Sequence, residues 1–144
     1  MKNTAIIIPT RLGAKRFPNK PLAKINNVPM IIHVLNRAKE SRIGDVFVAT
    51  PDDEIINIVK KNGGQAILTK RSHLSGSDRV YEAYTSELKD NVDLIINLQG
   101  DMPNIKPNSI SKLEKFMREN DCDIGTLASE IKSKDEIIDP NVVK

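Results

Sequence analysis

The stretch TAIIIPTRLGAKRFPNKPLAK, residues 4–24, decides the fold of this 144-residue chain. It opens with a short aliphatic run that ends at Pro9, and a loop rich in Lys and Arg follows. An apolar run without alternation is typical of a strand that is buried on both faces of a parallel sheet. The stretch therefore predicts a strand over residues 4–8 that delivers a cationic loop, residues 10–20, to one edge of a sheet. We call this segment the basic loop.

The charges of the basic loop favour a polyphosphate ligand. Guanidinium groups bind phosphate oxygens in pairs, and backbone N–H groups add positive partial charge. All eight basic residues up to Lys39 precede the first acidic residue, Glu40, whereas the rest of the chain holds 14 basic and 19 acidic residues. A solvated basic face or a nucleic-acid-binding arm is the alternative. We expect no nucleic-acid partner, because the aromatic residues on which bases stack make up only 3% of the chain.

Composition indicates a soluble globular protein of one domain, residues 1–144. Apolar residues make up 39% and charged residues 28% of the chain, as is usual for such proteins. The single cysteine, Cys122, excludes an internal disulfide and suits a reducing compartment. No apolar run is long enough to span a membrane, and the N-terminus does not resemble a signal peptide. We therefore expect a cytoplasmic protein without a membrane partner.

Apolar periodicity along the chain alternates between the strand and the helix pattern, with Asp52 predicted to cap the second helix. This alternation predicts a three-layer α/β domain with a mainly parallel sheet. The expected elements after the first strand are helix 30–41, strand 46–49, a helix ending at 62–64, strand 66–68, helix 78–88, strand 92–98, helix 108–119, strand 123–129, a helical turn at 134–138 and the start of a strand at 142–143.

Ligands of parallel sheets bind beyond the carboxyl ends of the strands. The basic loop, the segment LSGSDR at 74–79 and the segment QGD at 99–101 should therefore meet at one edge. Asp101 would face the cations there and can hold Mg²⁺ against phosphate oxygens. Each segment also has a plain structural alternative: a helix cap at 75–78, a surface role for Arg79, and a turn at Asp101. Phosphate-binding P-loop and dinucleotide-binding glycine motifs are absent.

With these residues in view, the chain resembles the sugar nucleotidyltransferases. In detail it is similar to the CMP-Kdo synthetases, the cytidylyltransferases that activate 3-deoxy-manno-octulosonate (Kdo). The related CMP-sialate synthetases share the basic loop but resemble the chain less at SGSDR and QGD. The stretches that carry the resemblance are IIIPTRLGAKRFPNKPL (6–22), NNVPMIIHVLNRA (26–38), LTKRSHLSGSDR (68–79) and NLQGDMPNIKP (97–107).

The resemblance implies a Rossmann-like nucleotidyltransferase fold and a reaction. The anomeric hydroxyl of Kdo attacks the α-phosphate of CTP, pyrophosphate leaves, and the CMP-Kdo formed serves lipopolysaccharide synthesis. It also implies Mg²⁺ as cofactor and a homodimer when the protein is full length. By position, the catalytic residues are Arg11, Lys20 and Asp101, with Asp101 as the metal ligand. The implied substrate-binding residues are Arg11, Arg16, Lys20, Thr69, Arg71, Ser75, Gly76, Arg79 and Gln99.

The chain departs from this family at two positions and in length. Thr10 stands where the family usually has Ala, and Met102 where it usually has Glu, which removes a carboxylate beside the metal site. The family's chains are considerably longer, and their additional part supplies most of the Kdo site, a further metal-binding Asp and most of the dimer surface. The alternatives are another sugar nucleotidyltransferase, such as a CMP-sialate synthetase, and a non-catalytic nucleotide-binding fragment.

Overall fold

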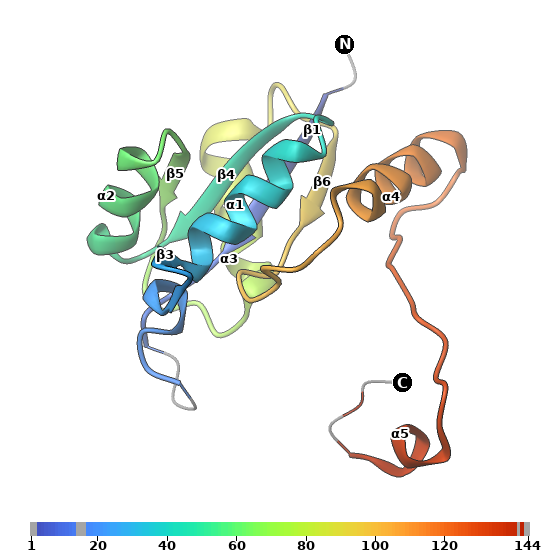
Figure 1. Ribbon diagram of the computed structural model, residues 1–144. Helices are drawn as coiled ribbons and strands as arrows, with labels where there is room; N and C mark the ends of the chain where they lie inside the picture. The colour runs from blue at the N-terminus through green and yellow to red at the C-terminus, as the bar shows by residue number, and fades with distance from the viewer. Residues whose placement is uncertain (1–2, 14–16, 141, 143–144) are drawn as a thin grey trace.

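A four-stranded parallel sheet forms the centre of the computed structural model, which describes residues 3–13, 17–140 and 142 (Figure 1). The strand order is β5-β4-β1-β6, so the first strand of the chain lies between two partners. Every residue of β1 is buried, which confirms the expectation from its aliphatic run. The strands are β1 (Thr4–Pro9), β4 (Asp45–Thr50), β5 (Gln65–Leu68) and β6 (Leu94–Asn97).

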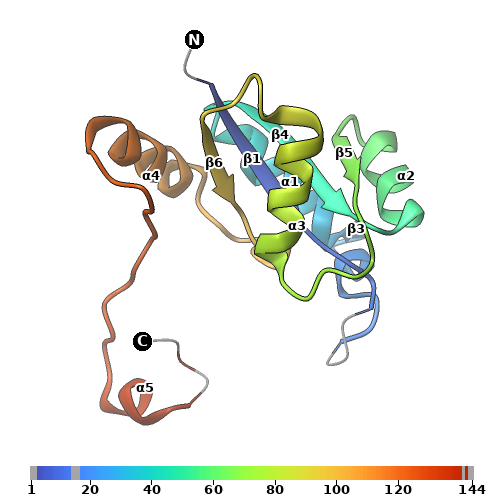
Figure 2. The same ribbon diagram turned by 180° about the vertical axis from the view of Figure 1, so that it is seen from behind.

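Helices cover both faces of this sheet, giving the predicted three layers. Side chains alternate along β1, so that Ile6 and Ile8 enter one apolar cluster while Ala5 and Ile7 enter the other. The first cluster is completed by α1, α2 and α4, and the second by α3 and the π-helical turn Tyr84–Leu88. Figures 1 and 2 show α1 and α3 on opposite faces. The helices are α1 (Met30–Glu40), α2 (Asp53–Lys61), α3 (Gly76–Ala83), α4 (Pro107–Glu119) and α5 (Lys134–Ile138).

A short hairpin separates the basic loop from α1. Its strands are β2 (Lys24–Ile25) and β3 (Val28–Pro29). Asn26 and Asn27 form its turn, with φ angles of 49° and 65°. A two-residue turn with both φ angles positive matches the right-handed twist of a hairpin, and Asn tolerates this conformation better than most residues. The hairpin fixes where the chain leaves the basic loop and enters α1.

Arg118 fastens α4 to the sheet by side-chain contacts that the sequence did not predict. It donates to both carboxylate oxygens of Asp93 at 2.9 Å, to Thr4 Oγ1 at 2.8 Å and to Glu114 at 3.1 Å. The hydrogen bonds to Asp93 are the main reason that the pKa of Arg118 is raised. The guanidinium group of Arg118 thus joins the starts of β1 and β6 to α4.

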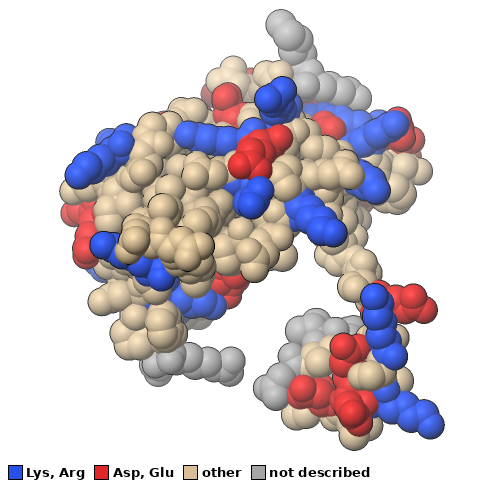
Figure 3. Space-filling view, in the orientation of Figure 1, with Lys and Arg blue, Asp and Glu red and all other residues tan. Residues whose placement is uncertain are grey.

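The strand predicted over residues 123–129 is not formed. The segment runs as extended chain away from the sheet, with Ile124 88% exposed and no ladder to β6 among the described residues. Backbone groups form a stable strand only when a neighbouring strand pairs with them, so aliphatic content alone does not make one. The helical turn predicted at 134–138 is confirmed as α5, where acidic side chains gather at the C-terminal end of the chain (Figure 3). Of the strand start expected at 142–143, Val142 lies in a bend and residue 143 is outside the described residues.

Within the described part of the chain, no helix combines the length and the apolar character needed to cross a lipid bilayer.

Gly44 allows the chain to enter β4 against the backbone of β1. A Cβ at this position would lie 1.9 Å from the carbonyl oxygen of Thr4 and 2.7 Å from its carbonyl carbon. The Thr4 backbone is held by pairing with β6, so it has little freedom to move away. We expect Gly44→Ala to lower the free energy of unfolding by about 1–3 kcal/mol, the usual effect of overpacking.

Urea unfolding of the two proteins measures this loss. Gly13→Ala is the matched control, because a Cβ there meets nothing within 4 Å. Equal unfolding free energies for Gly44→Ala and the parent protein would contradict the prediction.

Candidate active site

A pocket of about 210 Å³ lies beyond the carboxyl ends of β1 and β6. The three segments that were predicted to share one edge all line this pocket, which confirms that they meet. Because the strands are parallel, their carboxyl ends share this edge, and residues far apart in sequence come together there. The lining residues are Pro9, Thr10, Arg11, Lys20, Pro21, His73, Leu74, Ser75, Gly76, Arg79, Gln99, Gly100 and Asp101.

Two glycines let the walls of the pocket close on the end of β1. A Cβ on Gly100 would lie 3.1 Å from the carbonyl oxygen of Pro9, and a Cβ on Gly76 would lie 3.3 Å from Pro9 Cγ. Both distances are tighter than ordinary side-chain contacts. Gly76, a predicted substrate-binding residue, therefore has a packing reason for its identity as well as a place in the lining.

Two predicted catalytic residues form an ion pair within the pocket. Lys20 Nζ lies 2.8 Å from Asp101 Oδ2, and the side chains are 37% and 53% exposed. An ion pair this exposed contributes little to folding, so its partners are available for a ligand. When a ligand binds, the ammonium group of Lys20 can turn to a phosphate and the carboxylate of Asp101 to a cation.

The donor set fits a cation that arrives with a phosphate ligand. Mg²⁺ binds through one or two carboxylates together with substrate phosphates and water, and Asp101 supplies one carboxylate at the wall of a cationic pocket. Among residues 3–13, 17–140 and 142, no group of three or more His, Cys, Asp or Glu could hold a metal ion by itself. A single carboxylate beside basic side chains suits a metal ion that is shared with a substrate.

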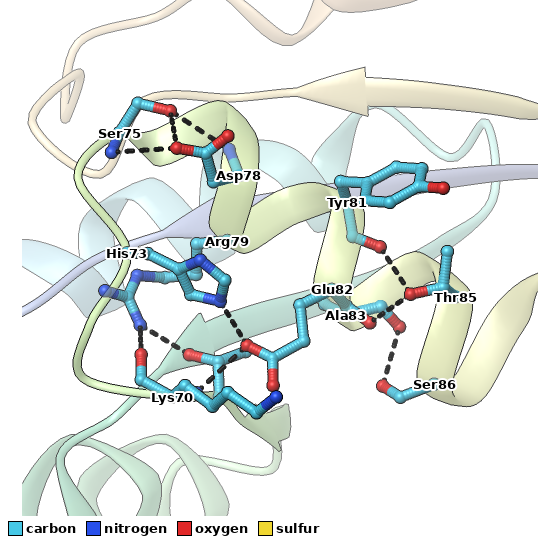
Figure 4. A network of polar contacts seen from close by, with 11 residues as sticks. Lys70, His73, Ser75, Asp78, Arg79, Tyr81, Glu82, Ala83, Thr85 and Ser86 are labelled. Carbon is cyan, nitrogen blue, oxygen red and sulfur yellow. Dashed lines mark hydrogen bonds and ion pairs between the residues drawn. The ribbon is translucent and has the colours of Figure 1, made fainter.

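Arg79 is a buried cation at the pocket wall, with only 2% of its surface exposed. This burial contradicts the alternative of a surface role. Its Nη1 donates to Thr69 Oγ1 at 2.5 Å and to the carbonyl oxygen of Lys70 at 3.0 Å (Figure 4). Burial lowers the pKa of Arg79 and nearby Arg11 lowers it further, while Asp52 and Glu82 act in the opposite direction. Both acceptors are uncharged, so an incoming anion would offset the burial of this positive charge.

Ser75 caps α3 and also lines the pocket. Its Oγ accepts the N–H of Asp78 at 3.1 Å, and its own N–H donates to Asp78 Oδ2 at 3.3 Å (Figure 4). This reciprocal pair is a capping box, so the structural alternative for this segment is confirmed. The cap places the positive end of the α3 backbone beside the pocket, where it favours an anion.

His73 and Glu82 form a pair that the sequence did not reveal. His73 lines the pocket, and its Nε2 contacts Glu82 Oε2, which also accepts the N–H of Lys70 at 2.9 Å (Figure 4). Burial alone would raise the pKa of Glu82, but the hydrogen bonds from His73 and Lys70 bring it below its ordinary value. The stabilisation from the contact between His73 and Glu82 is therefore complete above the ordinary pKa of a glutamate side chain. It is lost as the pH falls through the lowered pKa of Glu82 in the folded protein. This contact holds residues 69–75, the 69–75 loop, against α3.

Of the remaining predicted site residues, some line the pocket and others lie outside its lining. Gln99 lines the pocket, and its Nε2 donates to Asn97 Oδ1 at 3.1 Å. Thr69 is buried beneath Arg79, so that its hydroxyl is occupied by the guanidinium group. Arg71 does not belong to the lining and pairs instead with Asp52 at 2.8 Å. Arg16 lies outside the described residues.

The prediction that Asp52 caps α2 with its side chain is wrong. Asp52 occupies the N-cap position but makes no side-chain cap hydrogen bond. Its carboxylate accepts the N–H of Leu12 and the Arg71 guanidinium instead, because both groups reach it from neighbouring loops.

Comparison with known proteins shows the family that the chain matches. The family model described as "Cytidylyltransferase" matches residues 5–144. The 3-deoxy-manno-octulosonate cytidylyltransferases of Nitrobacter winogradskyi and Nitrobacter hamburgensis are 46% and 48% identical over 142 residues, which are 98% of this chain. A solved structure of CMP:2-keto-3-deoxy-manno-octonic acid synthetase complexed with CTP superposes with a TM-score of 0.78 and 41% identity, over 83% of this chain and 48% of that one. The chain spans 56% and 55% of the lengths of the two Nitrobacter proteins.

The buried charge of Arg79 predicts that a polyanion stabilises the protein. We expect inorganic tripolyphosphate at 100 times its Kd to add about 2.7 kcal/mol to the free energy of unfolding, the value that mass action gives. Arg79→Gln should lose most of this gain at the same concentration, because a hydrogen bond from a charged group contributes about 1.5–3 kcal/mol. Melting temperatures with and without tripolyphosphate, each variant against its own ligand-free form, measure the effect.

Arg37→Gln is the matched control for this experiment. It removes one positive charge from an exposed ion pair at the end of α1, which takes no part in the pocket. A loss of stabilisation as large in Arg37→Gln as in Arg79→Gln would show that net charge alone attracts the anion.

Proposed function

Because this chain belongs to the cytidylyltransferase family, we propose that the whole protein transfers a cytidylyl group from CTP to 3-deoxy-manno-octulosonate and releases pyrophosphate. The observation that carries the proposal is the pocket that brings Arg11, Lys20, Arg79 and Asp101 together at one end of the sheet. The names of the Nitrobacter relatives support Kdo as the acceptor, and the CTP complex of the similar structure supports CTP as the donor.

In the proposed reaction the anomeric hydroxyl oxygen of Kdo bonds to the α-phosphorus of CTP. The bond from that phosphorus to the bridging oxygen of the β-phosphate breaks, pyrophosphate departs, and the hydroxyl proton is released. Negative charge grows on the transferring group and on the leaving group, so catalysis consists mainly of positioning and electrostatic stabilisation. Arg11 and Lys20 are the residues that we assign to this neutralisation, since both line the pocket as cations.

The other pocket residues are assigned to the nucleotide. Arg79 cannot reorient freely, because Thr69 and the Lys70 carbonyl hold its guanidinium group, so it offers a fixed positive charge. The start of α3 also borders the pocket, with Gly76 in the lining, and its positive end favours an anion there. We assign the 69–75 loop and Gln99 to the cytosine and ribose, and the cationic side chains to the phosphates.

Mg²⁺ is the proposed cofactor, with Asp101 as its ligand from this chain. Bound there, the ion would supply positive charge to the phosphate oxygens of the nucleotide. Asp101 has a second task before the nucleotide binds, since it neutralises Lys20 at 2.8 Å. The ion pair holds both side chains at the pocket wall until substrate and metal replace each partner.

We propose a cytoplasmic homodimer, with the additional length of the relatives supplying the dimer surface and much of the Kdo site. A CMP-sialate synthetase and a non-catalytic nucleotide-binding fragment are the competing functions, and the experiments below separate them.

Replacing Asp101 tests its assignment to the metal. Asp101→Asn keeps the size of the side chain and removes its negative charge. We expect turnover in the whole protein to fall by about 10²-fold or more, the effect of losing one stabilising group of about 2.7–4 kcal/mol. Raising the Mg²⁺ concentration should restore part of the activity by mass action. The melting temperature should change little, because the Lys20–Asp101 pair is exposed.

A Mg²⁺ titration of turnover and a melting curve on the same variant provide the measurement. If Asp101 acts only in a turn, the melting temperature falls while turnover per folded molecule and its Mg²⁺ dependence stay normal.

The acceptor is tested by pyrophosphate release. With CTP and Mg²⁺, the whole protein should release pyrophosphate with Kdo and much less with sialic acid or a sugar 1-phosphate. Comparable kcat/KM values for sialic acid and Kdo would move the assignment to the CMP-sialate synthetases. CTP binding without pyrophosphate release for any of these acceptors would favour the non-catalytic alternative.

A further inference from the structure

We infer that Asp52 is a positioning residue that fixes the spacing between two walls of the nucleotide pocket, one formed by the described residues at the start of the basic loop and the other by the 69–75 loop. It does not line the pocket and acts only through the groups that its carboxylate holds. The inference deepens the proposed function and rests on it, since the walls that Asp52 joins are those that we assign to CTP.

The carboxylate of Asp52 is a buried bridge. Its side chain is 7% exposed. Oδ2 accepts the backbone N–H of Leu12 at 2.8 Å, and Oδ1 accepts Arg71 Nη1 at 2.8 Å. These partners are 40 and 19 residues away along the chain. The backbone of Asp52 is held in turn, because its N–H donates to Thr50 Oγ1 at 3.2 Å and Thr50 is fully buried.

Helix capping does not explain this carboxylate. The N–H groups of Ile55 and Ile56 at the start of α2 donate to the main-chain carbonyl of Asp52, and no side-chain cap is made. Both carboxylate oxygens are therefore used outside the helix. A buried carboxylate is costly unless charged and hydrogen-bonding partners compensate it, and here the compensation comes from the two loops.

Each end of the bridge adjoins a proposed ligand-binding group. Leu12 follows Arg11, which lines the pocket. Arg71 follows Lys70, whose carbonyl oxygen accepts the guanidinium of Arg79 at 3.0 Å. Moving either end would therefore displace a cation that faces the ligand, and displacements of about 1 Å can lower catalysis by about 10²-fold.

The negative charge of Asp52 also acts on Arg79 at the pocket wall. It opposes the effects of burial and of Arg11 on the pKa of Arg79, and so favours the charged guanidinium. The far end of the 69–75 loop has its own anchor, the contact between His73 and Glu82. The loop is thus attached to α3 through the contacts of Glu82 and Arg79, and to the basic loop through the carboxylate of Asp52, which joins both walls.

The test uses Asp52→Ala and Asp52→Asn in the whole protein, with CTP and Mg²⁺ titrated by calorimetry and with inorganic tripolyphosphate as a second probe. Loss of a hydrogen-bonded charge predicts that Asp52→Ala raises the Kd of both probes about tenfold. Asp52→Asn retains one oxygen for the N–H of Leu12 and should recover part of that loss. Asp53→Ala is the matched control, because Asp53 is an exposed acid in the first turn of the same helix.

A double-mutant cycle with Arg71→Ala identifies the bridge itself. If Asp52 and Arg71 act as one unit, the double variant should lose less affinity than the sum of the two single losses. Additive losses would show that Arg71 and Asp52 act independently, and this would overturn the bridge.

The other outcomes are equally decisive. A lowered melting temperature for Asp52→Ala with unchanged Kd values would reduce Asp52 to a structural residue, and an equal rise of the Kd values in Asp53→Ala would show that the loss of affinity does not depend on the bridge. Weakened CTP binding in Asp52→Ala supports the inference even if Kdo is not an acceptor. Failure of the proposed acceptor can therefore be told apart from failure of the inference about Asp52. A parent protein that binds neither CTP nor tripolyphosphate would overturn both the pocket assignment and this inference.

Discussion

The structure depends on the pairing of β1 with strands on both sides. Residues of β1 pair with β4 over Ala5 to Pro9 and with β6 over Thr4 to Ile7, so the strand has no free edge within that overlap. Its side chains supply both apolar clusters, because successive residues of a strand face opposite sides of the sheet. Everything that approaches the ligand pocket is placed relative to the point where this strand ends, at Pro9.

Basic side chains gather near that point, and three separate acids contact them. Asp101 pairs with Lys20, Glu82 with His73, and Asp52 with Arg71. The three pairs differ in exposure, since the side chain of Asp52 is 7% exposed and that of Asp101 is 53% exposed. Exposed pairs exchange partners at low cost, whereas a buried carboxylate that loses its partner is strongly destabilising. Asp101 is therefore suited to meeting a ligand, and Asp52 is suited to holding the walls that surround it.

Arg79 accounts for the affinity that we propose for anions. A guanidinium group that is 2% exposed and hydrogen-bonded to a hydroxyl and a carbonyl is placed before the ligand arrives. Preorganised charge of this kind stabilises an anion without reorganisation at the moment of binding. Gly76 and Gly100 are consistent with the same design, because each lets a segment lie against Pro9 where a larger side chain would hold the pocket open.

The sequence by itself determined the layer architecture, the parallel sheet and the edge at which the pocket lies. Those features follow from local patterns: the unbroken aliphatic run of β1, the helical spacing of Ile31, Val34 and Leu35, and the position of QGD directly after a strand. The tertiary structure alone decided which polar groups meet, because a side chain chooses among partners that only folding brings within reach. Asp52 has the sequence context of a helix cap but bonds to Leu12 and Arg71, and residues 123–129 contain Ile124 and Leu127 but have no partner strand among the described residues.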